Sequence, residues 1–168
     1  DGDRVGDACD VCPSTAPAAA IDANGCSNAQ VDSDSDGICN PGAPSNGPAA
    51  CFGIDNCPVV FNSTQLDSDG DGVGNACDSC PSTAPAATVD SLGCSLAQVD
   101  NDGDGFCNHG APSTGPAPGC TGTDNCTNAA NPTQDDTDAD GVGNACDACP
   151  STAPGAIVDQ TGCAVVQV

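Results

Sequence analysis

The chain has 168 residues, and its 24 acidic side chains are all aspartates, whereas Arg4 is its single lysine or arginine. The net charge of −23 argues against nucleic acid as a partner, because phosphate contacts require lysine or arginine. Three phenylalanines, with no tryptophan, tyrosine or methionine, cannot supply a large core, so bound cations and the 15 cysteines have to stabilise any fold.

The cysteines recur with a period of 68 or 69 residues, as from Cys9 to Cys77 and from Cys57 to Cys126. We expect repeat unit 1 at residues 1–66, cut at its N-terminal side, unit 2 at 67–135 and a partial unit 3 at 136–168. The conserved register between units predicts that the sequence is a window from a longer repeat array.

Glycine and proline are spread through the whole chain, with 21 and 14 copies, and no segment has a sustained helical or strand periodicity. The predicted fold is therefore an elongated tandem repeat array with little regular secondary structure, stabilised by calcium and disulfides. No apolar run is long enough for a membrane helix, so no membrane span is expected in this window.

The motif Asp-x-Asp-x-Asp-Gly is the main clue to chemistry. Aspartates at positions 1, 3 and 5 direct carboxylate oxygens inward, and the glycine at position 6 permits a sharp turn that brings in the carbonyl of position 7. This pattern predicts Ca²⁺ as the cofactor, while Mg²⁺ fits less well because it retains its waters. The alternative interpretation is a merely solvated acidic linker.

Two loops are complete and end in an aspartate at position 12. Their predicted ligands are Asp67, Asp69, Asp71, the Val73 carbonyl, Asn75 and Asp78, and then Asp136, Asp138, Asp140, the Val142 carbonyl, Asn144 and Asp147.

Two shorter loops have alanine at position 12, and a loop at the start of the chain has Arg4 in place of the glycine. The shorter loops need a further carboxylate, for which Asp22 and Asp90, or Asp55 and Asp124, are candidates. The predicted ligands are Asp32, Asp34, Asp36, the Ile38 carbonyl and Asn40; Asp100, Asp102, Asp104, the Phe106 carbonyl and Asn108; and, in the first loop, Asp1, Asp3, the Val5 carbonyl, Asp7 and Asp10.

Cys-x-x-Cys occurs three times and would also be compatible with zinc. His109 is the single histidine, however, and each Cys-x-x-Cys adjoins hard oxygen ligands. Disulfides formed in an oxidising compartment are therefore favoured, which places the chain outside the cell or at the cell surface.

The segments DNCPVVFNSTQLDSDGDGVGNACDSCP (55–81) and DNCTNAANPTQDDTDADGVGNACDACP (124–150) resemble thrombospondin type 3 repeats. The CPSTAP linkers also resemble calcium-repeat linkers of bacterial outer-membrane porin A-like proteins. The first resemblance implies Cys57–Cys77 and Cys126–Cys146, and the second implies Cys12–Cys26, Cys80–Cys94 and Cys149–Cys163. These pairs leave Cys39–Cys51 and Cys107–Cys120, with Cys9 bonded to a preceding repeat.

No constellation of catalytic groups is present, so we expect a non-enzymatic protein. The leading hypothesis is a calcium-binding extracellular structural repeat protein, a stalk, spacer or filament, whose partners are calcium ions and further copies of the repeat or chain. The alternatives are a calcium-dependent adhesion or ligand-binding module and a dockerin, whose loops would lead into helices. Asn62 fits the N-glycosylation sequon and is the expected glycan site. Phe52, Phe61 and Phe106 are expected to cover small local apolar clusters, with contact to a neighbouring repeat or chain as the alternative.

Overall fold

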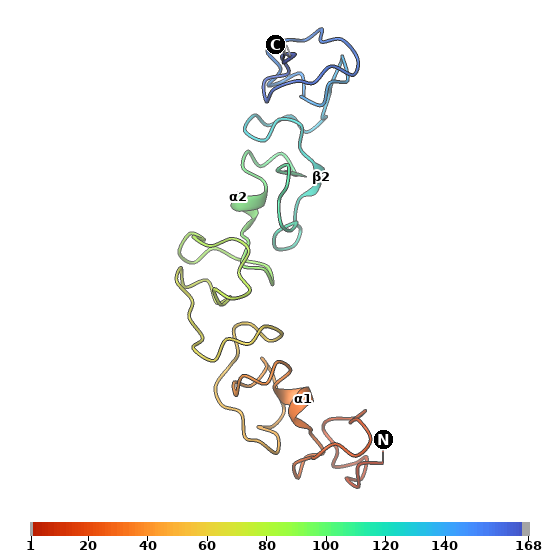
Figure 1. The fold of residues 1–168 in the computed structure, drawn as a ribbon, viewed down its shortest axis with the longest axis vertical. Coiled ribbons are helices and arrows are strands. Elements are labelled where there is room, and N and C mark those ends of the chain that lie inside the picture. Colours follow the sequence, from red (N-terminus) through yellow and green to blue (C-terminus); the bar gives the residue numbers. More distant parts are fainter. Residues whose placement is uncertain (1, 166–168) are drawn as a thin grey trace. The chain divides into compact units, whose positions relative to one another are not determined.

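The computed structural model describes residues 2–165, and regular structure within them is limited to two one-turn helices and one short pair of parallel strands (Figure 1). The helices and strands are α1 (Asn28–Val31), α2 (Leu96–Val99), β1 (Phe106–Cys107) and β2 (Thr121–Thr123), with Phe106 paired to Thr121 and Cys107 to Thr123. The prediction of little regular secondary structure is confirmed.

Contacts divide the chain into two compact units, Asp1–Pro81 and Ser82–Val168. This division follows packing, whereas the units expected at 1–66, 67–135 and 136–168 follow sequence period. The period-based boundaries stay a prediction. None of the described helices has both the length and the apolarity required to cross a lipid bilayer.

Each helix is positioned by a capping box at its N-terminus. In α1 the backbone N–H of Ser27 donates to Oε1 of Gln30 at 2.9 Å, and α2 repeats this bond between Ser95 and Gln98. The last residue of each helix is a fully buried valine, Val31 or Val99. The capped turn is thus short but fixes one apolar anchor in each unit.

Glycine turns close over these two valines. A Cβ atom on Gly47 would lie 2.6 Å from Cγ2 of Val31, and one on Gly115 would lie 2.9 Å from Cγ2 of Val99. Both glycines also have a positive φ, 67° and 72°. No other residue would allow the chain to pack so closely against the valine without strain.

Disulfides supply most of the remaining interior. Fourteen cysteines are disulfide-bonded, including Cys80 and Cys94, while Cys9 is free and exposed. Cys26 and Cys57 are fully buried, as is Cys94. Six bonds, with Cα–Cα distances of 5.0 to 5.7 Å, join the same cysteines as the pairing that the resemblances implied: Cys12–Cys26, Cys39–Cys51, Cys57–Cys77, Cys107–Cys120, Cys126–Cys146 and Cys149–Cys163.

We predict that Val99→Ala lowers the free energy of unfolding by about 2 kcal/mol, because it removes two buried carbons and leaves a cavity under Gly115. Thermal unfolding of the oxidised, calcium-loaded chain measures the effect. Val59→Ala is the matched control: Val59 is 79% exposed, so its truncation should change stability by less than about 0.5 kcal/mol. Equal losses in both variants would contradict the role of Val99 as an anchor.

Candidate metal centres

Four aspartate triads have the geometry of cation sites. In each triad one carboxylate oxygen per residue lies within 4.8 Å of the others. Two negative charges about 4 Å apart repel by roughly 1 to 4 kcal/mol in water or near a protein surface, so each triad favours a bound cation. The triads are Asp32–Asp34–Asp36, Asp67–Asp69–Asp71, Asp100–Asp102–Asp104 and Asp136–Asp138–Asp140.

The aspartate at position 1 folds each complete loop around itself. Oδ1 of Asp67 accepts a hydrogen bond from the N–H of Gly70 at 2.8 Å, and Oδ2 accepts one from Gly72 at 3.0 Å. Asp136 is bonded in the same way to Ala139 and Gly141. Gly72 and Gly141 both have a φ of 95°, so the glycine at position 6 is required for this turn.

Each triad contains at least one buried carboxylate oxygen that accepts no hydrogen bond. These oxygens are Oδ1 of Asp32, Oδ2 of Asp34, Oδ2 of Asp71, Oδ2 of Asp102, Oδ1 of Asp138 and Oδ2 of Asp140. Leaving a buried anionic oxygen without a donor is costly, and a hard divalent cation would satisfy several at once. The donor sets therefore fit Ca²⁺, which prefers carboxylate and carbonyl oxygens.

The aspartate at position 12 lies close to the triad in both complete loops. Burial, followed by the negative charges of Asp71, Asp69 and Asp67, raises the pKa of Asp78. Asp147 approaches Asp140, because a Cβ on Gly162 would contact carboxylate oxygens of both residues. Position 12 is thus a fourth carboxylate beside each complete triad.

In the shorter loops, Asp55 and Asp124 come close to the triads. Asp124 is 3% exposed, and its buried Oδ2 accepts no hydrogen bond. Burial, and then the charges of Asp104, Asp124 and Asp100, raise the pKa of Asp102. Asp55 affects Asp34 in the same way, since burial and the charges of Asp36, Asp55 and Asp32 raise the pKa of Asp34.

The other two candidates, Asp22 and Asp90, are used in linker turns. A hydrogen bond from the Ser45 side chain is the main cause that lowers the pKa of Asp22. Burial opposes the shift at Asp90, but hydrogen bonds from Ser113 and from the N–H groups of Leu92 and Cys94 lower its pKa overall. Each carboxylate thus joins its linker by hydrogen bonds to the loop that the next disulfide closes, Cys39–Cys51 or Cys107–Cys120.

Two glutamines, which were not among the predicted site residues, hold Asp55 and Asp124 in place beside the triads. Nε2 of Gln134 donates to Oδ2 of Asp104 at 3.2 Å and to Oδ1 of Asp124 at 3.0 Å. Gln65 makes the equivalent bonds to Asp36 at 3.4 Å and to Asp55 at 2.9 Å. The sequence signal was present, since each glutamine follows its Asp-Asn-Cys aspartate by ten residues.

The predicted asparagine ligands at position 9 point back along the loop. Oδ1 of Asn75 accepts the N–H of Ser68 at 2.8 Å, and its Nδ2 donates to the Ser68 hydroxyl at 2.7 Å. Asn144 does the same with Thr137, and Asn40 with Ser33, whereas Asn108 reaches Asn101 and Gln98. These amides close the loops; their predicted role as ligands is compatible with contact through a water.

Each position-7 residue donates its backbone N–H to the position-5 carboxylate of its triad. Val73 donates to Asp71 at 2.8 Å, and Val142 donates to Asp140 at 2.9 Å. Ile38 and Phe106 donate to Asp36 and Asp104 in the same manner. Their carbonyls stay predicted ligands.

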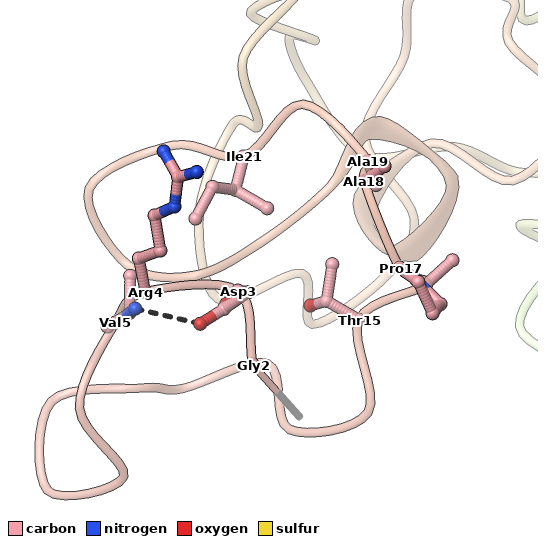
Figure 2. Close-up of a pocket in the computed structure, with 10 residues that line it drawn as sticks. Gly2, Asp3, Arg4, Val5, Thr15, Pro17, Ala18, Ala19 and Ile21 are labelled. Atoms are coloured by element: carbon pink, nitrogen blue, oxygen red, sulfur yellow. Dashed lines mark hydrogen bonds between the residues drawn. The ribbon is translucent and has the colours of Figure 1, made fainter.

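The loop at the start of the chain follows the path of the complete loops. Arg4 keeps the positive φ of the glycine that it replaces, 83°, and Val5 donates to Asp3 at 2.8 Å. Figure 2 shows the Arg4 side chain extending past Ile21 while the Asp3 carboxylate turns to Val5. Asp10 and Asp3 both lie against Gly25, Asp7 is exposed, and Asp1 lies outside the described residues.

Glycines of two linkers pack closely against position-12 carboxylates. A Cβ on Gly25 would contact Asp10, and one on Gly162 would contact Asp147. The N–H of Thr152, from the same linker as Gly162, donates to Oδ2 of Asp138 at 2.6 Å. The CPSTAP linkers therefore contribute to the loops as well as separating them.

Comparison with known protein families identifies thrombospondin type 3 repeats at residues 65–87 and 134–155. These are calcium-binding repeats, and they cover the two complete loops. A search of curated proteins finds no match for the chain. The disulfides indicate an oxidising compartment. The thrombospondin type 3 module is non-catalytic.

The predicted glycan site, Asn62, lies inside the glutamine network. Its Nδ2 donates to Oδ1 of Asn56 at 2.7 Å, and its Oδ1 accepts from Gln65 at 3.0 Å. A glycan on Nδ2 would have to leave one N–H for Asn56. Glycosylation at Asn62 stays a prediction.

We predict that Gln134→Ala weakens calcium binding at the Asp100–Asp104 loop by about 10- to 100-fold, because Asp104 and Asp124 lose their shared donor. Isothermal titration of the chelator-treated, oxidised chain measures the affected site. Gln65→Ala should weaken the Asp32–Asp36 loop to a similar extent, and exposed Gln160→Ala should leave every site unchanged. Unaltered calcium affinities in both glutamine variants would show that these amides do not orient the carboxylates.

The lowered pKa of Asp90 predicts a pH-dependent contribution to stability. A carboxyl with a lowered folded pKa stabilises the fold above its ordinary value of 3.8 and loses this contribution as the pH falls through the folded pKa. Asp90→Asn should therefore cost about 1 kcal/mol near neutral pH, discounted for its exposure, and progressively less in acid.

Thermal unfolding of the wild type and of Asp90→Asn from neutral to acidic pH measures this difference. Asp135→Asn removes an equal charge from an exposed carboxylate and serves as the control. A difference between wild type and Asp90→Asn that grows as the pH falls would contradict the assignment.

Proposed function

We propose that the chain is an extracellular structural protein whose repeats are stiffened by calcium and that it acts as a spacer or stalk without enzymatic activity. The observation that supports this most directly is the set of buried carboxylate oxygens without donors in the four triads. A bound divalent cation would satisfy several of them at once, and the identified repeats are calcium-binding.

The proposed ligands of the complete loops are the three triad aspartates, the position-7 carbonyl and the position-12 aspartate, with position 9 acting through water. In the shorter loops, Asp55 and Asp124 take the place of the missing position-12 aspartate. Asp3 and Asp10 would serve in the first loop together with Asp1.

Calcium would supply charge neutralisation at these positions, while the protein supplies the turn, the disulfides and the glutamine donors. One site with a dissociation constant of ~0.1 mM at ~1 mM calcium adds only about 1.4 kcal/mol. The stability of the folded chain would therefore depend on many calcium sites acting together with the disulfides. Near-identical repeats support a mechanical role, because a spacer reuses one unit. The resemblance of the linkers to those of porin A-like proteins stays a prediction.

The test is a calcium titration of the chelator-treated, oxidised chain, with bound ions counted in parallel and the particle size followed by small-angle X-ray scattering. We expect several bound ions per chain and a narrower range of conformations when calcium is present. The absence of both changes would overturn the proposal and leave an acidic, disulfide-bonded spacer.

A pair of charge-matched variants localises the effect. Asp140→Asn removes a buried oxygen of one triad and should weaken one site by more than about tenfold, whereas Asp159→Asn removes the same charge from an exposed linker carboxylate and should have little effect. Equal, small losses in the two variants would indicate a diffuse ion atmosphere and not built sites.

A further inference from the structure

The first compact unit exposes a group of large apolar side chains that its fold does not use. Phe52, Ile54, Val59, Phe61 and Leu66 are 60 to 79% exposed. The expectation that Phe52 and Phe61 cover local clusters is therefore wrong, whereas Phe106 packs near Gly122. We call residues 52–66 the apolar segment.

The second repeat provides an internal comparison for the apolar segment. Counting from the aligned cysteines Cys51 and Cys120, the equivalent residues are all polar or small. They are exposed as well. The equivalents of Phe52, Ile54, Val59, Phe61 and Leu66 are, respectively, Thr121, Thr123, Asn128, Ala130 and Asp135.

Equivalent backbone hydrogen bonds nevertheless occur at both ends of the segment in the two copies. Phe52 donates to the Gly37 carbonyl at 3.0 Å, and Thr121 donates to Gly105 at 2.9 Å. The Leu66 carbonyl accepts from Asn75 at 2.8 Å, as the Asp135 carbonyl does from Asn144 at 2.8 Å.

The disulfides that follow are also equivalent, with Cα–Cα distances of 5.7 Å for Cys57–Cys77 and 5.6 Å for Cys126–Cys146. The fold is thus built once with apolar residues and once without them. The second repeat therefore follows this path without these side chains, and large apolar side chains exposed together on one surface are typical of interaction sites.

Hydrogen bonds draw the parts of the apolar segment around one acidic loop. The N–H of Asn62, next to Phe61, donates to Oδ2 of Asp36 at 3.1 Å, and Phe52 is bonded to the adjacent Gly37. Leu66 directly precedes the Asp67–Asp71 triad. Apolar side chains therefore lie between two strongly acidic loops.

Charge decides what kind of partner fits. Four divalent ions, one for each triad, would supply eight positive charges and leave a net charge of −15 on the chain. A second copy would oppose acidic loops to acidic loops, and like charges across an interface are costly. A cationic partner gains from the same field.

We propose that the apolar segment binds another polypeptide, one that presents apolar side chains flanked by lysine or arginine. The apolar contacts would supply the binding free energy, and the acidic loops on both sides would steer and orient the basic residues. The corresponding segment of the second repeat lacks the apolar half of this pattern and would not bind.

The experiment uses the full oxidised chain with saturating calcium, at about 0.15 M salt to limit nonspecific charge effects. The probe is an amphipathic helical peptide of leucine and lysine, and its control is a serine and lysine peptide of equal charge. We expect isothermal titration to show one leucine–lysine peptide per chain and no binding of the serine–lysine peptide.

The first variant is Phe52→Thr, Ile54→Thr and Phe61→Ala, which copies the second repeat and keeps the charge. We expect it to bind the leucine–lysine peptide at least about tenfold more weakly, with its calcium count unchanged as the check on folding. The reciprocal variant, Thr121→Phe, Thr123→Ile and Ala130→Phe, should gain a second peptide site.

Three results would overturn the proposal. The parent chain could bind neither peptide, or the first variant could bind the leucine–lysine peptide as tightly as the parent, which would mean that charge alone is responsible. The third is calcium-dependent dimerisation of the parent in sedimentation velocity that the first variant abolishes, because it would assign the apolar segment to a second copy.

Discussion

Repulsion between closely spaced carboxylates is the constraint on which this structure depends. Each triad holds three oxygens within 4.8 Å of one another, and burial together with neighbouring charge raises the pKa of Asp34, Asp78 and Asp102. Backbone N–H groups offset only part of this repulsion, and the same hydrogen bonds hold the position-1 carboxylate in the loop. The fold is thus arranged around charges that an external cation has to neutralise.

Disulfides stabilise that arrangement in a chain that has only a very small apolar core. Val31 and Val99 are the fully buried aliphatic side chains in the described part of the chain, and most other buried apolar residues are bonded cysteines. A disulfide stabilises chiefly by restricting the unfolded chain and needs little apolar area. Calcium sites and disulfides therefore perform different tasks: the disulfides fix which loops are neighbours, and the carboxylates set how the loops respond to ions.

Local features and the disulfide pairs were predictable from the sequence, whereas the other contacts between distant residues were not. The triads follow from residues spaced by two, and the disulfide pairs follow from the family resemblance. Asp124 was one of two candidates, because a loop closed by Cys107–Cys120 separates it from Asp100 and only the folded path shows which carboxylate returns. The roles of Gln134 and Gly162 depend on contacts with Asp104 and Asp147, each more than ten residues away.

The two repeats separate what the backbone requires from what the surface adds. Positions that differ little between them are the aspartates of the loops, the cysteines, and glutamines such as Gln65 and Gln134, all of which make contacts that fix the chain path. Positions that differ most, such as Phe52 against Thr121, are exposed in both. Because the buried apolar residues are mainly disulfide-bonded cysteines and only two valines, an exposed residue can change without disturbing a large packed core. A repeat of this type can therefore acquire a binding surface in one copy while its neighbour keeps only the structural role.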